Sequence, residues 1–313
     1  MSRSLYPLAS LSQIRQTPSR VDGIPAPLES AILANACKLI HTAGILLHQK
    51  QVAVATAQIL FHRFWFVSSL KSFSVTDIAF GALYLGSKLE ECSLRVRDLV
   101  NVYHVLLQRA KGKVGKEIGI MSYFGNTFYE LKDALVVAEM QILKRLGFNT
   151  HVVLPYGSLV SYLRLLGQDK PNVVAKAWGY LNDALQSPVY ALYQVPTIVS
   201  AAILLTIRFL AIRLPDAWWK LFDAEWEDVW SVCGYIMRLY HPEVDGKVVQ
   251  GMLTKGDVRA WLEKNPGAVD VVQQEETTTI DQGQLTTISF TGIQSSCIDK
   301  FTFIQFNNAV YPQ

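Results

Sequence analysis

Residues 74–91 read SVTDIAFGALYLGSKLEE, and this stretch decides the fold. Its apolar residues Ile78, Leu85 and Leu89 recur at helical spacing, which predicts a helix packed into a core. Ser74 is a typical helix start, and the charged run after Leu89 marks the end. The middle of the stretch is poor in bulky side chains. Other helices can therefore approach closely at its small residues, namely Ala79, Gly81, Ala82 and Gly86.

Helical periodicity continues on both sides of this stretch. A first set of helices is predicted over residues 28–48, 52–67, 74–91, 96–109 and 126–146, and a second set over 156–166, 172–186, 196–212, 216–222 and 225–240. At an offset of 120 residues, Ala82 falls on Ala202, Leu85 on Leu205 and Lys88 on Arg208. This pattern favours an internal repeat. Strands do not alternate with helices, so we predict an all-α fold.

The two ends of the chain differ from this helical body. Residues 1–27 contain several prolines and predict an irregular arm with one short helix near Ser10–Arg15. Residues 246–313 predict a tail with one helix over Lys255–Lys264, followed by a Gln/Thr-rich run and a strand-like apolar end. The expected domains are 1–27, 28–152, 153–245 and 246–313.

Composition excludes several classes of protein. Half of the 313 residues are hydrophobic and the net charge is +3, so a large core is expected and there is little electrostatic argument for nucleic acid. The cysteines lack metal-ligand or disulfide spacing, which fits a reducing compartment. No secretory signal is visible at the N-terminus. The most apolar stretch, Val195 to Ile207, is shorter than the ~20 residues that span a bilayer, so we expect a buried core helix there.

We find no sequence pattern of a catalytic or cofactor site. Phosphate-binding glycine loops, zinc-protease motifs and nucleophile elbows are absent from the sequence. The six histidines lack ligand spacing on a shared helix face, and the adjacent Glu90 and Glu91 point in different directions. We therefore expect no catalytic residue, no metal and no cofactor. The sequence predicts a scaffold with a binding face.

The segment SKLEE, residues 87–91, resembles the third helix of a cyclin box, whose pattern is close to L-A-S-K-x-E-E. Residues 43–66 and 95–109 are similar to the L-type cyclins, and residues 138–156 resemble the end of a first cyclin box. The similarity covers residues 28–245 and implies two tandem five-helix cyclin boxes. Cell-cycle cyclins carry an Asp-Arg pair where this chain has His62 and Arg63, so the transcriptional class fits better. Arg63 is expected to order neighbouring carbonyls or carboxylates inside the first repeat.

The resemblance also implies a kinase interface. In cyclins the lysine of this segment and a glutamate of helix five face the kinase, and here these positions are Lys88 and Glu139. A lysine and a glutamate can satisfy backbone groups of a partner while apolar neighbours exclude water. We expect both side chains to be exposed in the free protein. The expected interface consists of Leu85, Lys88, Leu89, Glu139, Leu143 and Phe148.

The function that this implies is a nuclear regulatory subunit, not itself an enzyme. It would bind and activate a cyclin-dependent kinase in transcription and pre-mRNA processing, with transcription or splicing factors as further partners and no membrane or direct nucleic-acid contact. An alternative is a general transcription factor of the same double-repeat fold that binds promoter DNA. In residues 156–245, however, nine acidic residues outnumber seven basic ones, which disfavours DNA. An α-helical enzyme is the third and least favoured interpretation.

Overall fold

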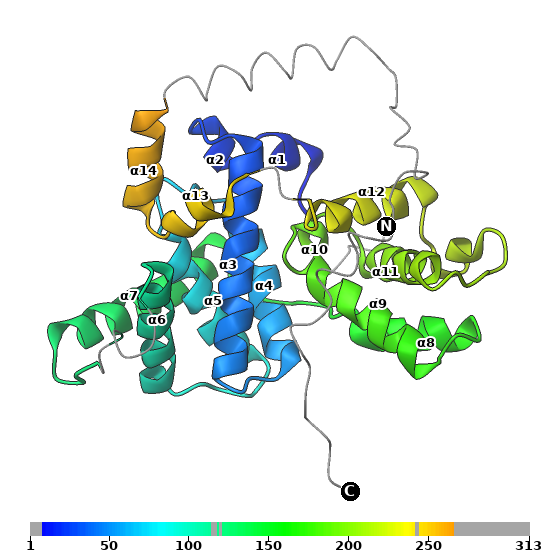
Figure 1. The fold of residues 1–313 in the computed structure, drawn as a ribbon, viewed down its shortest axis with the longest axis horizontal. Helices are drawn as coiled ribbons and strands as arrows, with labels where there is room; N and C mark the ends of the chain where they lie inside the picture. Colours follow the sequence, from blue (N-terminus) through cyan, green and yellow to red (C-terminus); the bar gives the residue numbers. More distant parts are fainter. Residues whose placement is uncertain (1–7, 114–117, 119–120, 242–243, 266–313) are drawn as a thin grey trace, which may run out of the picture. The chain divides into compact units, whose positions relative to one another are not determined.

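A computed structural model describes residues 8–113, 118, 121–241 and 244–265. Within these residues the chain is helical and contains no strand. The first repeat consists of α3 (Ala26–Leu46), α4 (Gln51–Trp65), α5 (Val75–Leu89), α6 (Val96–Ala110) and α7 (Asn126–Arg145). All five lie within a few residues of the predicted bounds, and Figure 1 shows them as the dark-blue to green part of the chain.

The second repeat follows the same plan with shorter helices. It consists of α8 (Tyr156–Leu165), α9 (Pro171–Ala184), the short α10 (Val189–Leu192), α11 (Val195–Phe209), the 3₁₀ helix η2 (Trp218–Phe222) and α12 (Trp226–Arg238). The central helices α5 and α11 each have 15 residues and begin at Val75 and Val195, 120 residues apart. The fold class predicted from the sequence, two tandem helical repeats, is therefore confirmed, although α10 was not foreseen.

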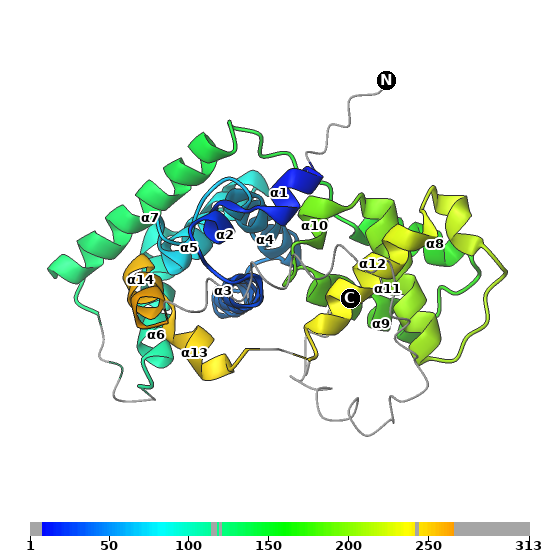
Figure 2. The same cartoon turned by 90° about the horizontal axis from the view of Figure 1, so that it is seen from above.

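Helix α5 is the centre of the first repeat, as its small residues predicted. It contacts α3, α4, α6 and α7, and Figure 2 shows it between α4 and α7. A methyl group added at Gly86 would lie 2.8 Å from the carbonyl oxygen of Ala53 in α4. The missing side chain thus allows the two helix backbones to approach each other. At the start of α5, the hydroxyl of Ser74 accepts a hydrogen bond from the Asp77 N–H, as expected of an N-cap.

Helix α4 belongs to the cores of both repeats. Leu60 and Phe64 lie in the first core, whereas Ala55 and Ile59 pack with the second. The side-chain amide of Gln51 donates to Asn182 Oδ1 in α9 at 3.1 Å. A helix buried on two faces needs apolar or small residues nearly all round. This explains why every residue of α4 from position 53 to position 65 is buried.

The N-terminal arm is more ordered than predicted. It contains α1 (Leu11–Arg15), which confirms the predicted short helix, and α2 (Pro18–Val21), which was not predicted. The hydroxyl of Thr17 and the guanidinium of Arg20 both bind the Glu29 carboxylate of α3, at 2.7 and 2.8 Å. Glu29 is only 3% exposed. A buried carboxylate requires such partners, and here they fasten the arm to α3.

Two helices that follow the second repeat pack against the first. They are α13 (Gly246–Gly251) and α14 (Lys255–Lys264), and the second has the predicted bounds. Val249, Met252 and Val258 lie in the core of the first repeat. The Thr76 N–H at the start of α5 donates to the carbonyl of Leu253. Residues 246–265 therefore complete the first repeat, whereas the predicted strand-like end lies outside the described residues.

Helix α11 contains the most apolar stretch of the chain. Eleven of its 15 residues are buried, which confirms the interpretation of this segment as a core helix. None of the described helices has the length and the apolar character needed to cross a membrane.

Candidate functional site

Glycine 81 brings α7 against α5 and so places Glu139. A methyl group at Gly81 would lie 2.7 Å from the Cβ atom of Ala138 and 3.0 Å from the backbone nitrogen of Glu139. Such a close approach of two helices is open only to a residue without Cβ. Ala138 is buried in the contact, and Glu139, the next residue, lies at its edge. The small residue at position 81 of α5 thereby fixes the position of the Glu139 carboxylate on α7. Glu139 lies 51 residues after Lys88 in the sequence.

Lys88 and Glu139 form an ion pair across this edge. Lys88 Nζ lies 2.8 Å from Glu139 Oε1 and 3.0 Å from Oε2, so the ammonium donates to both oxygens. The lysine side chain is 41% exposed and that of the glutamate 14%. The sequence-based expectation that both are exposed thus holds for Lys88 and not for Glu139. The carboxylate of Glu139 is half-buried because Gly81 lets α7 approach so closely.

The surroundings of Lys88 keep it charged. Burial tends to lower the pKa of its ammonium, but the hydrogen bond and negative charge of Glu139 outweigh this and raise the pKa above its ordinary value. The ammonium also lies 4.0 Å from the centroid of the Tyr84 ring, a cation–π contact. The pair is therefore a fixed dipole at the surface, with donors and acceptor lone pairs still available to a partner.

The four apolar residues of the predicted interface are exposed to different degrees. Phe148 is 66% and Leu89 40% exposed, and Leu143 is half-buried against the first core. Leu85 is 4% exposed and belongs to the core itself. We call Lys88, Leu89, Glu139, Leu143 and Phe148 the α5–α7 face. Leu85 supports this face from below and does not form part of its surface.

Phe148 is held in an unusual backbone conformation. Gly147 and Phe148 have φ angles of 57° and 60°, in the left-handed region. The Phe148 N–H donates to the Leu143 carbonyl at 2.8 Å, which closes the end of α7. This region is natural for glycine and unfavourable for a bulky residue. The strain places a large aromatic ring in solvent at the end of α7, which suits a contact with another molecule.

Helix α7 carries a second apolar stripe that the sequence interpretation missed. Tyr129, Val136 and Met140 are 50%, 46% and 45% exposed and recur at helical spacing, on a different side from the buried Leu135 and Ile142. A helix with apolar residues on two sides packs on two sides. The signal was present in the sequence, because α7 has more apolar positions than one buried stripe needs.

Arg63 fulfils the role predicted for it. It is 6% exposed, and its Nη1 donates to the His151 carbonyl at 2.7 Å. This bond ties α4 to the segment between the repeats. The preceding residue, His62, is buried completely, and its Nε2–H donates to the Leu185 carbonyl of the second repeat at 3.2 Å. His62 therefore joins the two repeats, Arg63 ties α4 to the segment after α7, and neither side chain belongs to the α5–α7 face.

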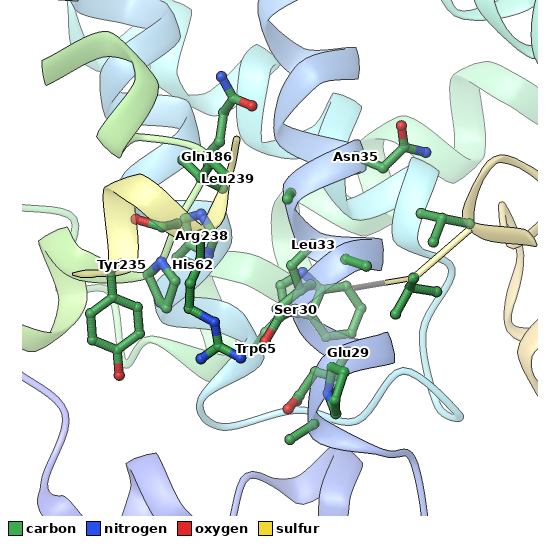
Figure 3. Close-up of a pocket in the computed structure, with 18 of the residues that line it drawn as sticks. Glu29, Ser30, Leu33, Asn35, His62, Trp65, Gln186, Tyr235, Arg238 and Leu239 are labelled. Atoms are coloured by element: carbon green, nitrogen blue, oxygen red, sulfur yellow. The ribbon is translucent and has the colours of Figure 1, made fainter. Parts of the chain in front are cut away.

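A cavity of about 610 Å³ lies between α3, α12 and the N-terminal arm. Figure 3 shows Glu29, Ser30, Leu33 and Asn35 of α3, Tyr235 and Arg238 of α12 and the following Leu239 around this cavity, together with His62 and Trp65 of α4. Glu29 already binds the arm, and burial lowers the pKa of His62 to about 4. The Glu29 carboxylate and the His62 imidazole thus do not form an acid–base pair matched to neutral pH. Over the described part of the chain, no three His, Cys, Asp or Glu side chains gather as metal ligands would.

The structure therefore defines a class of protein. It is an all-α protein of two tandem helical repeats, with a charged and apolar face on the central and last helices of the first repeat. A family model described as the cyclin N-terminal domain matches residues 27–151. The human protein Cyclin-L1 is 37% identical over 243 residues, which are 77% of this chain and 45% of Cyclin-L1. Cyclin-L2 of Mus musculus is 36% identical over 231 residues, 73% of this chain and 44% of the relative.

Solved structures agree with the fold. A chain of the yeast RNA Pol II CTD kinase CTDK-1 complex superposes with a TM-score of 0.61 at 16% identity, covering 76% of this chain and 74% of its own. A chain of the CAK complex of Chaetomium thermophilum bound to ATP-gamma-S gives a TM-score of 0.56 at 15% identity, covering 94% and 96%. Residues 27–151 belong to the cyclin N-terminal domain family, and the chain is similar to the L-type cyclins. It spans less than half the length of these L-type relatives.

Proposed function

We propose that this chain is the regulatory subunit of a cyclin-dependent kinase that acts in transcription, and that the kinase docks on the α5–α7 face. The observation that carries the proposal is the Lys88–Glu139 ion pair, flanked by the exposed side chains of Leu89 and Phe148. The similarity to Cyclin-L1 and Cyclin-L2 supports it.

The chemistry of the face suits a helix or loop of a kinase. Leu89, Phe148 and the second apolar stripe of α7 (Tyr129, Val136 and Met140) offer apolar area that excludes water on docking. The ammonium of Lys88 can donate to a carbonyl of the partner, and the carboxylate of Glu139 can accept from an amide, without breaking their mutual bond. Each group is already oriented by the other, so little side-chain freedom is lost on binding.

Activation would follow from this contact without any chemistry in the chain itself. A protein kinase needs its mobile regulatory helix turned inward, so that a lysine–glutamate ion pair forms in its active site. A subunit that binds only the inward position stabilises the active state. The chain transfers no phosphate in this scheme and needs no cofactor.

Two further parts of the proposal concern the cellular location of the protein and the step of gene expression in which it acts. The similarity to L-type cyclins supports action in pre-mRNA processing and a nuclear location. Microscopy of the tagged protein tests the location, and a change in splice-site use after its depletion tests the process. Promoter binding, the alternative function, is disfavoured by the acidic balance of the second repeat.

Kinase binding and activation test the main proposal. The double variant Leu89→Ala with Phe148→Ala removes two exposed side chains and should fold normally. If each truncation at a docked face costs about 1–2 kcal/mol, kinase affinity falls roughly thirty- to several-hundred-fold, and stimulated phosphorylation falls with it. Leu165→Ala is the matched control, because Leu165 is 77% exposed on α8 of the second repeat. Equal kinase binding by the double variant and the control would contradict the proposal.

A further inference from the structure

The second repeat carries a row of tryptophan rings that runs from its core to its surface. The ring centroids of Trp219 in η2 and Trp226 in α12 lie 4.4 Å apart, and those of Trp226 and Trp230 lie 5.9 Å apart. Trp219 and Trp226 are half-buried, and Trp230 is 46% exposed. We call these three residues the tryptophan ladder. They belong to neither the α5–α7 face nor the cavity beside α3.

The inner end of the ladder is fixed in the core. The ring centroid of Trp218, which is 4% exposed, lies 6.1 Å from that of Trp219 and 6.2 Å from that of Phe222. Phe222 in turn stacks on Tyr162 of α8, with centroids 3.8 Å apart. Aromatic rings packed in this way have few alternative rotamers. The outer ring is therefore presented by a rigid support, and binding to it costs little conformational entropy.

The backbone around η2 is strained to hold this arrangement. Ala217 and Asp223, the residues on either side of η2, have φ angles of 55° and 52°. Residues with a Cβ atom adopt this region at a cost. The second repeat thus accepts an unfavourable conformation at Ala217, whereas aspartate tolerates this region better, where the segment Trp218–Phe222 turns against α12. Strain of this kind gathers at sites of function.

The segment that carries the ladder is rich in negative charge. Between Pro215 and Trp230 there are five carboxylates and one basic residue, Lys220. All five carboxylates are exposed, namely Asp216, Asp223, Glu225, Glu227 and Asp228. This field repels phosphate groups, so it disfavours nucleic acid and anionic lipid as partners. It attracts a cationic segment of a protein.

From this combination we propose that the tryptophan ladder and its carboxylates bind an arginine-rich segment of another protein. The planar guanidinium stacks on an indole face and also pairs with carboxylates through two parallel hydrogen bonds. One arginine would cover the exposed ring of Trp230, and its neighbours in the segment would pair with carboxylates such as Glu227. Lysine offers only a point charge and should bind less well. The surface lies in the second repeat, so the proposal does not depend on the kinase.

Peptide binding to the full chain tests this assignment. The probe is a fluorescein-labelled twelve-residue peptide of four Arg-Gly-Ala repeats, followed by fluorescence anisotropy at low and physiological salt. Its lysine and glutamate counterparts have the same length. We expect the arginine peptide to bind most tightly, the lysine peptide several-fold less tightly, and the glutamate peptide not at all. Binding should weaken as salt rises, because exposed charge pairs are screened.

Two kinds of variant separate the rings from the charges. Trp230→Ala should weaken binding of the arginine peptide about two- to fivefold, the range of an exposed cation–π contact. The double reversal Glu225→Lys with Glu227→Lys removes no ring and should weaken it about tenfold or more. The controls are Phe124→Ala, which removes a ring 94% exposed in the first repeat, and Glu263→Lys, which reverses an exposed charge on α14.

The outcomes are decisive in both directions. Tightest binding of the arginine peptide, weakened by both ladder variants and by neither control, supports the assignment. An arginine peptide that binds no better than the glutamate peptide, or equally well to the charge-reversed variant, overturns it. A lysine peptide that binds as tightly as the arginine peptide also overturns it, since stacking of the guanidinium is then not used. If Trp230→Ala fails to fold, the charge-reversed variant decides alone.

Discussion

The two repeats share one plan and differ in how closely their central helices are approached. Gly81 and Gly86 of α5 correspond, 120 residues on, to Ala201 and Thr206 of α11. In α5 the absent side chains admit α7 and α4, whereas in α11 a buried threonine is tolerated at the second position. The helical repeat therefore does not require glycine at these two positions of its central helix. In the first repeat the glycines let α7 and α4 pack closely on α5, and the close packing of α7 places Glu139 beside Lys88.

The ends of the two central helices also differ in their ion pairs. Lys88 at the end of α5 pairs with Glu139, whereas its counterpart Arg208 at the end of α11 has no ion-pair partner among the residues that the structure describes. The exposed features of the second repeat are the tryptophan rings and carboxylates instead. Two copies of one helical unit have thus acquired different surfaces. We propose that one surface binds a kinase and the other a cationic segment.

The largest expected effect concerns the helices that cover only the first repeat. A chain ending at residue 245 lacks α13 and α14, whose Val249, Met252, Leu253 and Val258 are buried. At about 1.5 kcal/mol or more for each buried side chain, the first repeat should lose about 6 kcal/mol of unfolding free energy. Denaturant unfolding followed by circular dichroism measures this loss. A chain ending at residue 265 is the control, which should unfold like the full chain and bind the kinase within a few-fold. Equal stability of the two truncated chains would refute the role assigned to α13 and α14.

The next effect concerns His62, which joins the repeats. Burial lowers its pKa from the ordinary 6.5 to about 4, so the unfolded chain takes up this proton at a higher pH than the folded one. The stability it contributes is complete above pH 6.5 and is lost as the pH falls to 4, by about 3 kcal/mol. His62→Gln keeps an N–H for the Leu185 carbonyl and cannot titrate. Its unfolding free energy should fall less over this range than that of the parent, by about this amount. Parallel pH profiles of parent and variant would contradict the assignment.

A pair of glycine substitutions sharpens the comparison of the repeats themselves. Gly86→Ala forces a methyl group to 2.8 Å from the Ala53 carbonyl oxygen and should cost about 1–3 kcal/mol. Gly234→Ala in α12 of the second repeat is the control, because a methyl group there would meet no atom within 4 Å. It should stabilise the helix by about 0.5–1 kcal/mol. Thermal unfolding of the two variants checks both signs. A Gly86→Ala variant as stable as the parent would show that close approach at α5 is not needed.

Much of this architecture could be predicted from the sequence because it depends on local periodicity. The bounds of α5, α7 and α14 and the offset of 120 residues all follow from the spacing of apolar, small and capping residues. The packing of residues 246–265 on the first repeat could not be predicted, because it depends on contacts between segments far apart in the chain. The same holds for the anchoring of the arm through Glu29.

The residues of the candidate site come from the sequence, and their geometry comes from the structure. Lys88 and Glu139 were found through the resemblance of their segments to the cyclin box, and the sequence placed each on a helix. Their mutual ion pair and the unequal exposure of the two side chains depend on how far α7 approaches Gly81. Periodicity alone does not give that distance. The left-handed backbone of Phe148 could not be predicted either, since bulky residues rarely adopt that region.

Kinase association of charge-exchanged variants tests the central claim most directly. Because Lys88 and Glu139 bind each other, the double exchange Lys88→Glu with Glu139→Lys restores their ion pair in reverse and should leave the melting temperature nearly unchanged. A docked kinase would still meet each charge in the wrong place, at a cost of about 2–5 kcal/mol, or roughly thirty- to several-thousand-fold in affinity. Lys220→Glu, on η2 of the second repeat, is the control and should change little. We predict that the double exchange folds and fails to bind the kinase. Binding and activation equal to those of the parent would mean that the pair serves only to hold α5 against α7, and would contradict the account.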